Sequence, residues 1–266
     1  MRELEREAPE TARVAADATP LPRLAIVGRG RVGTALATAA ERAGLDVVMA
    51  GRDDLAQVVP SAGAALLCVP DEAIPGACEK LVATATELRL VGHVSGATGL
   101  DALGAAAERG CDTFSLHPLQ TVPETGAELT GAPCAVAGSS PASLEFATAL
   151  TERVGMRPFE VHESSRAAYH AAASIASNFL VTLEESAARL MGAAGVTGAR
   201  ELLAPLVLRT AANWSEQGPE ALTGPIARGD EATIARHLEA LAERAPELLP
   251  LYEALAERTR ALKGAS

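Results

Sequence analysis

Three glycines in a six-residue segment have the spacing of a phosphate-binding loop. They lie in the sequence GRGRVG at residues 28–33, after an apolar segment at residues 24–27 and before a helix-like stretch. In that context the first glycine permits a tight turn, the second lets the backbone approach a pyrophosphate, and the third allows close helix–strand packing. The residues expected to contact a dinucleotide here are Gly28, Arg29, Gly30, Arg31, Val32 and Gly33. A glycine-rich turn that holds no ligand is the alternative.

The residues after the second apolar segment, 46–50, indicate which dinucleotide would bind. An NAD-binding protein usually places Asp or Glu there to accept hydrogen bonds from the ribose 2′-hydroxyl group. Here Gly51 and Arg52 follow, and a guanidinium can bind a 2′-phosphate with two hydrogen bonds. The sequence therefore favours NADP(H). In the alternative interpretation Arg52 is solvated and Asp53 or Asp54 binds the ribose.

Polar residues also follow the later apolar segments. Ligands bind at the carboxyl ends of the strands in a doubly wound sheet, so residues at these ends are candidates for a site. We expect Val69 and Pro70, after the third segment, to contact the cofactor. We expect Ser95, after the fourth, and His117, after the fifth, to belong to the catalytic site. A histidine at a strand end is also often a structural residue with satisfied hydrogen bonds.

A second polar group has helical spacing. His170, Ser174 and Asn178 recur at i, i+4 and i+8, so they would share one face of a helix predicted over residues 165–191. One interpretation is a hydrogen-bonded seam between helices. In the other, this face closes over the nicotinamide ring, with His170 as the proton donor, Asn178 and Ser95 orienting the reacting group, and Ser174 contacting the substrate. His117 is the alternative acid, since histidine titrates near neutral pH.

An arginine further along the chain is a candidate for binding a substrate carboxylate. Arg228 lies in the sequence TGPIAR that begins at Thr223, and both residues are expected to contact the substrate. Arg228 is equally suited to cap a helix or to pair with Asp230.

The elements that position these residues follow from hydrophobic patterning. Short apolar runs alternate with Ala- and Leu-rich stretches, which predicts an α/β domain with a doubly wound parallel sheet. The strand signal then stops, and the remainder predicts a smaller all-helical domain, with Asp230 as one N-cap. The predicted strands lie at residues 24–27, 46–50, 64–69, 90–94, 113–116 and 134–137, and the predicted helices of the second domain at 165–191, 199–214, 231–244 and 246–262. We therefore predict a disordered polar leader at 1–22, a dinucleotide-binding domain at 23–161 and a helical substrate and dimerisation domain at 162–266.

Composition excludes several classes of partner. The 266 residues carry a formal net charge of −11 and only 3% aromatic residues, which argues against nucleic acids and acidic membrane surfaces. No apolar run approaches the ~20 residues that span a bilayer. The four cysteines form no CxxC pair and have no zinc-like spacing, so we predict no metal site. They are interpreted as buried thiols of a cytoplasmic protein.

Taken together, the motifs resemble those of a bacterial two-domain family, in which a Rossmann-like domain precedes a helical C-terminal domain of unknown function. The resemblance rests on the motifs GRGRVG at 28–33, HVSGATGL at 93–100, HPLQT at 117–121, YHAAA at 169–173 and LTGPIARGD at 222–230. More broadly, the plan is similar to the 6-phosphogluconate dehydrogenase superfamily, which includes ketopantoate reductase, pyrroline-5-carboxylate reductase and deazaflavin-dependent NADP reductases.

The resemblance implies NADP-linked hydride transfer, an active site between the domains, and a homodimer formed through the helical half. The sequence departs from the superfamily at one point. β-Hydroxyacid dehydrogenases and ketopantoate reductase use a helix lysine with an asparagine four residues on, whereas His170 and Asn178 stand here at a different spacing.

The sequence therefore predicts an NADP(H)-dependent oxidoreductase that acts on a small carbonyl or imine compound, in the first instance a 2-keto acid such as ketopantoate. A prephenate- or pyrroline-5-carboxylate-type enzyme is one alternative, and a deazaflavin could replace the organic substrate as hydride partner. A non-catalytic NADP(H)-binding sensor is the alternative from another class.

Overall fold

The computed structural model describes residues 21–124 and 127–264. The predicted leader at 1–22 lies outside the described residues except for its last two. The described chain divides into two compact units between Ala173 and Ser174, whereas the change in strand signal places the boundary at 161/162. Each unit is described by itself.

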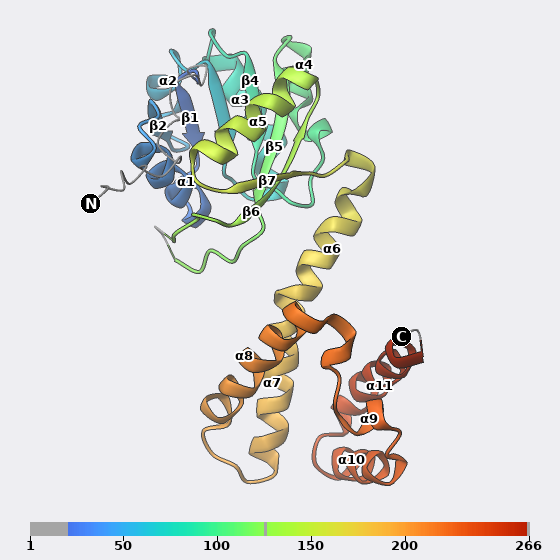
Figure 1. Ribbon diagram of the computed structural model, residues 1–266. Coiled ribbons are helices and arrows are strands. Elements are labelled where there is room, and N and C mark those ends of the chain that lie inside the picture. The colour runs from blue at the N-terminus through green and yellow to red at the C-terminus, as the bar shows by residue number, and fades with distance from the viewer. Residues whose placement is uncertain (1–20, 125–126, 265–266) are drawn as a thin grey trace, which may run out of the picture. The chain divides into compact units, whose positions relative to one another are not determined.

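The first unit is built on a seven-stranded sheet with the order β2-β1-β3-β4-β5-β6-β7 (Figure 1). Its strands are β1 (Leu24–Val27), β2 (Val47–Ala50), β3 (Ala64–Leu67), β4 (Leu90–His93), β5 (Asp112–Pro118), β6 (Pro133–Gly138) and β7 (Arg157–Glu160). The first five strands are parallel to one another. The predicted α/β class and the Rossmann-type sheet are confirmed.

Helices cover both faces of this sheet, which explains why β1 and β3 are continuously apolar. On β1, Leu24 and Ile26 pack against α1 (Arg31–Arg42) and α5 (Pro141–Arg153). The alternate residues, Ala25 and Val27, pack on the other face with the remaining helices. Those helices are α2 (Leu55–Val58), α3 (Ile74–Thr84) and α4 (Gly104–Glu108), together with the 3-10 turns η2 (Asp71–Ala73) and η3 (Leu100–Leu103).

The last two strands differ from the prediction. β6 runs antiparallel to β5, and the described residues of their connection, 119–124 and 127–132, contain no helix of the kind that usually links parallel strands. β7 lies parallel to β6 at the edge of the sheet and has no counterpart among the predicted strands. Its sequence, RPFE, is short and polar, as edge strands often are, so a search for apolar runs does not find it.

The C-terminal part of the described chain is helical, as predicted. It contains α6 (Arg166–Ala176), α7 (Asn178–Ala193), α8 (Ala199–Gln217), α9 (Pro225–Arg228), α10 (Glu231–Arg244) and α11 (Leu249–Gly264), with η4 (Glu163–Ser165), η5 (Gly218–Ala221) and η6 (Pro246–Leu248) between them. The side chain of Asp230 accepts a hydrogen bond from the Thr233 amide and caps α10, which confirms the predicted N-cap.

The prediction of one continuous helix over residues 165–191 is wrong. Ser177 forms a turn that separates α6 from α7, and its φ of −119° and ψ of −73° depart from the regular helical values of about −63° and −42°. Serine and asparagine are poor residues for a helix interior because their side chains compete for backbone hydrogen bonds, and Ser177 and Asn178 stand together here. His170 and Ser174 both lie on α6, four residues apart, whereas Asn178 is the first residue of α7, so the three residues do not belong to one helix.

Candidate functional site

The glycine loop has the predicted strand–turn–helix context. β1 ends at Val27 and α1 begins at Arg31, with Gly30 as its N-cap. Gly28 has φ +122°, and a Cβ atom there would overlap the carbonyl oxygen of Cys68. A Cβ atom at Gly33 would overlap the carbonyl oxygen of Gly28, so only glycine allows α1 to approach the loop this closely. At Gly30, by contrast, no other atom would lie within 4 Å of a Cβ, so a ligand has access to the backbone at the helix N-terminus.

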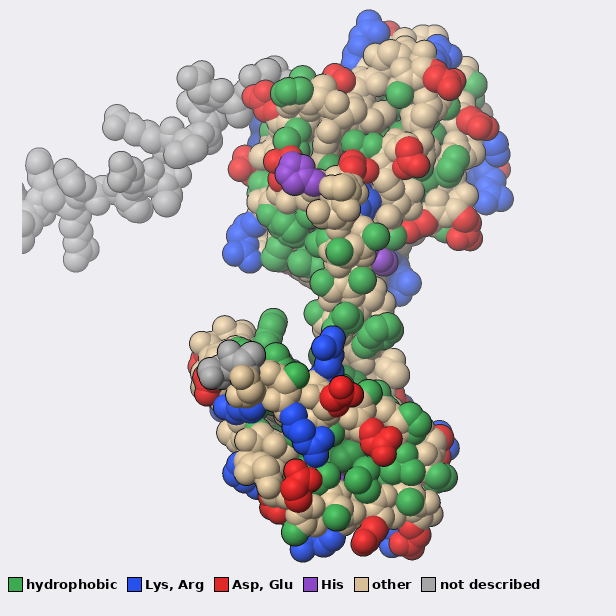
Figure 2. Space-filling model, turned by 90° about the vertical axis from the view of Figure 1, so that its right-hand side faces the viewer, with side chains coloured by type: hydrophobic (Ala, Val, Ile, Leu, Met, Phe, Trp, Pro, Cys, Tyr) green, Lys and Arg blue, Asp and Glu red, His purple; other side chains and the backbone are tan. Residues whose placement is uncertain are grey.

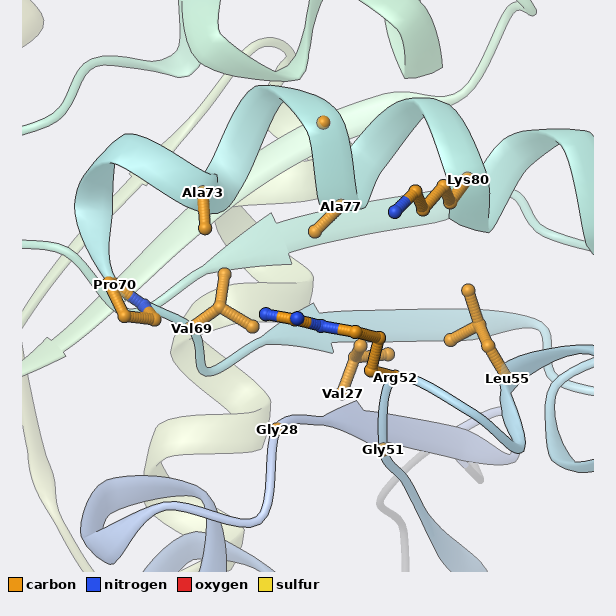
Figure 3. Close-up of a pocket in the computed structure, with 11 residues that line it drawn as sticks. Val27, Gly28, Gly51, Arg52, Leu55, Val69, Pro70, Ala73, Ala77 and Lys80 are labelled. Atoms are coloured by element: carbon orange, nitrogen blue, oxygen red, sulfur yellow. The ribbon is translucent and has the colours of Figure 1, made fainter.

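A pocket of about 290 Å³ lies beside this loop, at the carboxyl ends of β1, β2 and β3 and against α3 (Figure 3). Its lining is apolar apart from two basic side chains. It comprises Val27, Gly28, Gly51, Arg52, Leu55, Val69, Pro70, Ala73, Gly76, Ala77 and Lys80. Four of these residues, Gly28, Arg52, Val69 and Pro70, are among those that the sequence predicts to contact a cofactor.

The α3 wall of the pocket was not anticipated. Ala73, Ala77 and Lys80 are separated by four and three residues, so they lie on one face of the helical segment that follows β3. That spacing, read together with the strand end at Val69 and Pro70, is the signal that could have found them.

The three arginines near the loop have different environments. Arg29 forms an ion pair with Asp54, and it also donates a hydrogen bond to the carbonyl oxygen of Met49. A hydrogen bond from the Gly51 amide and then the Arg29 guanidinium lower the pKa of Asp54. The guanidinium of Arg31 donates to the carbonyl oxygen of Pro123. Arg52 is the one of the three that lines the pocket.

The turn after β4 is held by its own hydrogen bonds. His93 is fully buried, with Nδ1 accepting from the Ser95 amide and Nε2 donating to the carbonyl oxygen of Gly99, and burial lowers its pKa. The Ser95 hydroxyl donates to Asp71 at 2.8 Å and accepts from the amides of Ala97 and Thr98. These three bonds use the full capacity of a hydroxyl, so Ser95 ties the β4 turn to the β3 turn.

His117, Tyr169 and His170 form a cluster within the first unit. His117 Nδ1 lies 2.6 Å from the Tyr169 hydroxyl, and its ring meets that of His170 edge-on at 6.1 Å. Burial, and then repulsion from His170, lower the pKa of His117 to about 4. Burial raises the pKa of Tyr169 to about 12. At neutral pH the phenol therefore keeps its proton and the imidazole is neutral, and one hydrogen bond joins the two groups. Gly96 makes room for this arrangement, because a Cβ atom there would lie 2.7 Å from His117 Cε1.

Arg166 holds the start of α6 in place and was missed in the sequence. Only 4% of its side chain is exposed, and it pairs with Glu163. It also donates hydrogen bonds to Ser115 Oγ at 2.6 Å and to the Ser95 carbonyl oxygen at 3.3 Å. Tyr169 and His170 follow within one turn, so this anchor positions them.

The remaining predicted site residues belong to the second unit. They are Asn178, predicted to orient the reacting group, and the predicted substrate contacts Ser174, Thr223 and Arg228. The guanidinium of Arg228 donates a hydrogen bond to the carbonyl oxygen of Thr223 and so closes the turn that precedes α9. Their contacts with a substrate stay predictions.

Sequence comparison matches both parts of the chain to described domains. Residues 50–118 match a Rossmann-like domain, and residues 132–259 match the domain of unknown function DUF2520. The chain is a Rossmann-like protein with a DUF2520 domain. This confirms the two-domain family suggested by the motifs. No curated protein has a sequence significantly similar to that of this DUF2520 protein.

Solved structures share the fold over nearly the whole DUF2520 protein. A Bacteroides fragilis protein provisionally named an NADP oxidoreductase is 24% identical with a TM-score of 0.74, covering 90% of this chain and 97% of its own. An Aspergillus terreus reductive aminase in complex with NADPH4, cyclohexanone and allyl amine is 17% identical with a TM-score of 0.63, covering 89% and 93%. Plasmodium falciparum pyrroline carboxylate reductase with NADP bound is 12% identical with a TM-score of 0.59, covering 92% and 100%. At these identities the likeness concerns the fold.

None of the helices described for the DUF2520 protein combines the length and the apolar character needed to cross a membrane.

Proposed function

We propose that this chain is an NADP(H)-dependent oxidoreductase acting on a small carbonyl or imine compound. The observation that carries the proposal is the pocket beside the glycine loop, which Arg52 enters from the end of β2. Of the two residues that could otherwise accept a hydrogen bond from a ribose hydroxyl, Asp53 and Asp54, the second is already paired with Arg29. The similar solved structures support the same cofactor, because one is named an NADP oxidoreductase and the other two contain NADPH4 or NADP.

The residues present suit such a cofactor. The amides at the start of α1 would bind the pyrophosphate, and the glycines at 28 and 33 keep that surface free of side chains. The apolar lining of the pocket suits an adenine ring, and the guanidinium of Arg52 suits a 2′-phosphate. When bound, the cofactor would supply a hydride from C4 of its nicotinamide ring.

On the protein side, a proton donor must complete the reduction, and we assign that role to His170. The low pKa of His117 argues against it as an acid at neutral pH, and its Nδ1 is already bonded to Tyr169. Repulsion from the His170 imidazole is, after burial, one of the causes that lower the pKa of His117. Ser95 is a positioning residue here, because its hydroxyl is fully bonded. Asn178 keeps its predicted role as an orienting group.

For the substrate, the resemblance favours a 2-keto acid such as ketopantoate. The fold shared with a reductive aminase and with pyrroline carboxylate reductase favours an imine as the second candidate. Arg228 and Thr223 keep their predicted role as contacts for a substrate carboxylate, and Ser174 as a further substrate contact.

The cofactor assignment is tested by titrating the chain with NADPH and with NADH, using nicotinamide fluorescence. We expect tighter binding of NADPH, and Arg52→Ala should weaken it by about 1–3 kcal/mol, the value of charge-assisted hydrogen bonds, while sparing NADH. Equal losses for both coenzymes would contradict the role of Arg52. If neither NADPH nor NADH binds, the proposed function is contradicted.

Turnover separates an enzyme from a sensor. NADPH oxidation is measured with ketopantoate, other 2-keto acids, cyclic imines and oxidised deazaflavin. Oxidation with one of these classes identifies the hydride acceptor, whereas tight NADPH binding without oxidation by any of them favours the sensor.

We also propose that the helical part forms a homodimer. Large apolar side chains are exposed on α7 and α8, and Figure 2 shows hydrophobic surface on the helical unit. They are Phe179, Leu180, Val181, Leu202, Leu206, Leu208 and Trp214. Apolar patches of this kind often mark protein interfaces.

A further inference from the structure

Two cations enter the dinucleotide pocket from opposite walls. Arg52 follows β2, and Lys80 lies on the second turn of α3. In Figure 3 the guanidinium of Arg52 and the ammonium of Lys80 both project into the space between α3 and the ends of the strands. Neither side chain forms an ion pair with any residue in the described part of the chain, and the described lining of the pocket contains no carboxylate.

This concentration of positive charge is unlike the rest of the molecule. The chain has 34 acidic residues against 23 lysines and arginines, yet both titratable groups of this pocket are basic. Their neighbours are mainly apolar, including Val27, Leu55 and Val69, so an anion bound here would be screened less than at an open surface. The site therefore suits a multiply charged anion attached to an apolar group.

From this we propose that Lys80 is the second cation that binds the 2′-phosphate of NADP(H), opposite Arg52, and so helps to determine the preference for NADP(H) over NAD(H). The inference rests on the proposed function. A phosphate monoester carries a charge of about −1.5 to −2 at pH 7, so one guanidinium leaves it incompletely neutralised. Arginine can bind two phosphate oxygens in a fixed geometry, whereas the flexible stem of lysine brings a compact charge to the third.

The order of residues along the pocket-facing side of α3 allows Lys80 to bind the phosphate beside Arg52. Ala73, Gly76 and Ala77 precede Lys80 on the pocket wall, and they leave room for a flat ring along the helix. Lys80 is the first residue of that wall with a long side chain. It therefore lies beyond the apolar part of the wall, where a phosphate on the ribose could meet both cations.

The test is calorimetric and uses the full chain without turnover. The probes are adenosine 2′,5′-bisphosphate, which has the 2′-phosphate, and adenosine 5′-monophosphate, which lacks it. Lys80→Met removes the charge and keeps most of the aliphatic stem, and Lys80→Arg keeps the charge. Lys263→Met is the matched control, because it removes the only other lysine, which pairs with Glu220 in the second unit.

We expect Lys80→Met to weaken binding of the bisphosphate about tenfold, as loss of one charge-assisted hydrogen bond entails, and to change binding of the monophosphate less than about twofold. Lys80→Arg should keep most of the affinity, and Lys263→Met should keep all of it. The inference is overturned if Lys80→Met retains the affinity for the bisphosphate or weakens both probes equally.

Failure of this inference is distinguishable from failure of the proposed function. If Arg52→Ala removes the preference for the bisphosphate while Lys80→Met keeps it, Lys80 has no role in the preference and the NADP(H) assignment stands. If the unmodified chain binds neither NADPH nor the bisphosphate, both are overturned.

Discussion

The buried anchor at the start of α6 allows two substitutions to be compared. Arg166 is 4% exposed, whereas the side chain of its partner, Glu163, is 41% exposed. Glu163 also accepts a hydrogen bond from the Leu100 amide. Removing Glu163 therefore leaves a buried guanidinium, whereas removing Arg166 leaves a carboxylate that is partly exposed to water.

Glu163→Ala leaves a guanidinium buried without its carboxylate. Removing one partner of a buried pair costs about 3–5 kcal/mol, and because water reaches the Glu163 side of this one we expect about 2–3 kcal/mol. Arg166→Met removes the buried charge, keeps a comparable apolar stem and leaves a carboxylate that water can solvate. Its main loss is the hydrogen bond to Ser115 Oγ, so we expect about 1–2 kcal/mol.

The comparison is made by urea denaturation followed by circular dichroism, with the transition of the first unit analysed separately because the chain has two units. The double variant Glu163→Ala with Arg166→Met should be at least as stable as Glu163→Ala alone, since the uncompensated charge is gone. Arg200→Met is the control, because its ion pair with Glu185 is exposed, and it should leave the free energy of unfolding nearly unchanged. A larger loss for Arg166→Met than for Glu163→Ala would refute this account of the anchor.

Three further predictions concern the cluster and the helical unit. His170→Ala should keep the affinity for NADPH but lower turnover about 10²–10⁴-fold, as loss of a general acid does, and unchanged turnover would exclude it as the donor. The pKa of His117 is about 4 in the folded chain against about 6.5 unfolded, so the unfolded state binds more protons between these values. The free energy of unfolding should therefore fall as pH decreases from about 6.5 towards 4, and less so in His117→Gln; parallel pH profiles of the two proteins would contradict the lowered pKa. Light scattering should give about twice the chain mass if α7 and α8 form a dimer interface, and a monomer at all concentrations would count against it.

Much of the first unit could be predicted from local sequence. The five parallel strands are short apolar runs bounded by glycine, proline and polar residues, and burial on both faces requires that composition. The glycine loop was recognisable because each of its three glycines stands at a position where the loop has no room for a side chain or needs free access to the backbone. The N-cap at Asp230 was recognisable because the side chain bonds an amide only three residues away.

The rest depended on contacts between distant residues. The direction of β6 depends on how its connection folds, and β7 is held mainly by its neighbour, so their sequences carry little signal. The structural role of His93 rests on its two hydrogen bonds within its own turn, which only the structure shows. Arg166 could not be recognised in an Ala-rich helix, because two of its hydrogen-bond partners come from segments 51 and 71 residues away.

The sequence alone determined the strands β1 to β6 and the loop that suits a phosphate, because apolar patterning, sterics and hydrogen bonding among near neighbours decide these features. Only the tertiary structure decided which polar groups meet. It placed Lys80 on the wall of the pocket that Arg52 enters, and it brought His117 to Tyr169 and His170. Those contacts depend on strand order and helix orientation, which arise from packing of the whole core and not from the residues in contact.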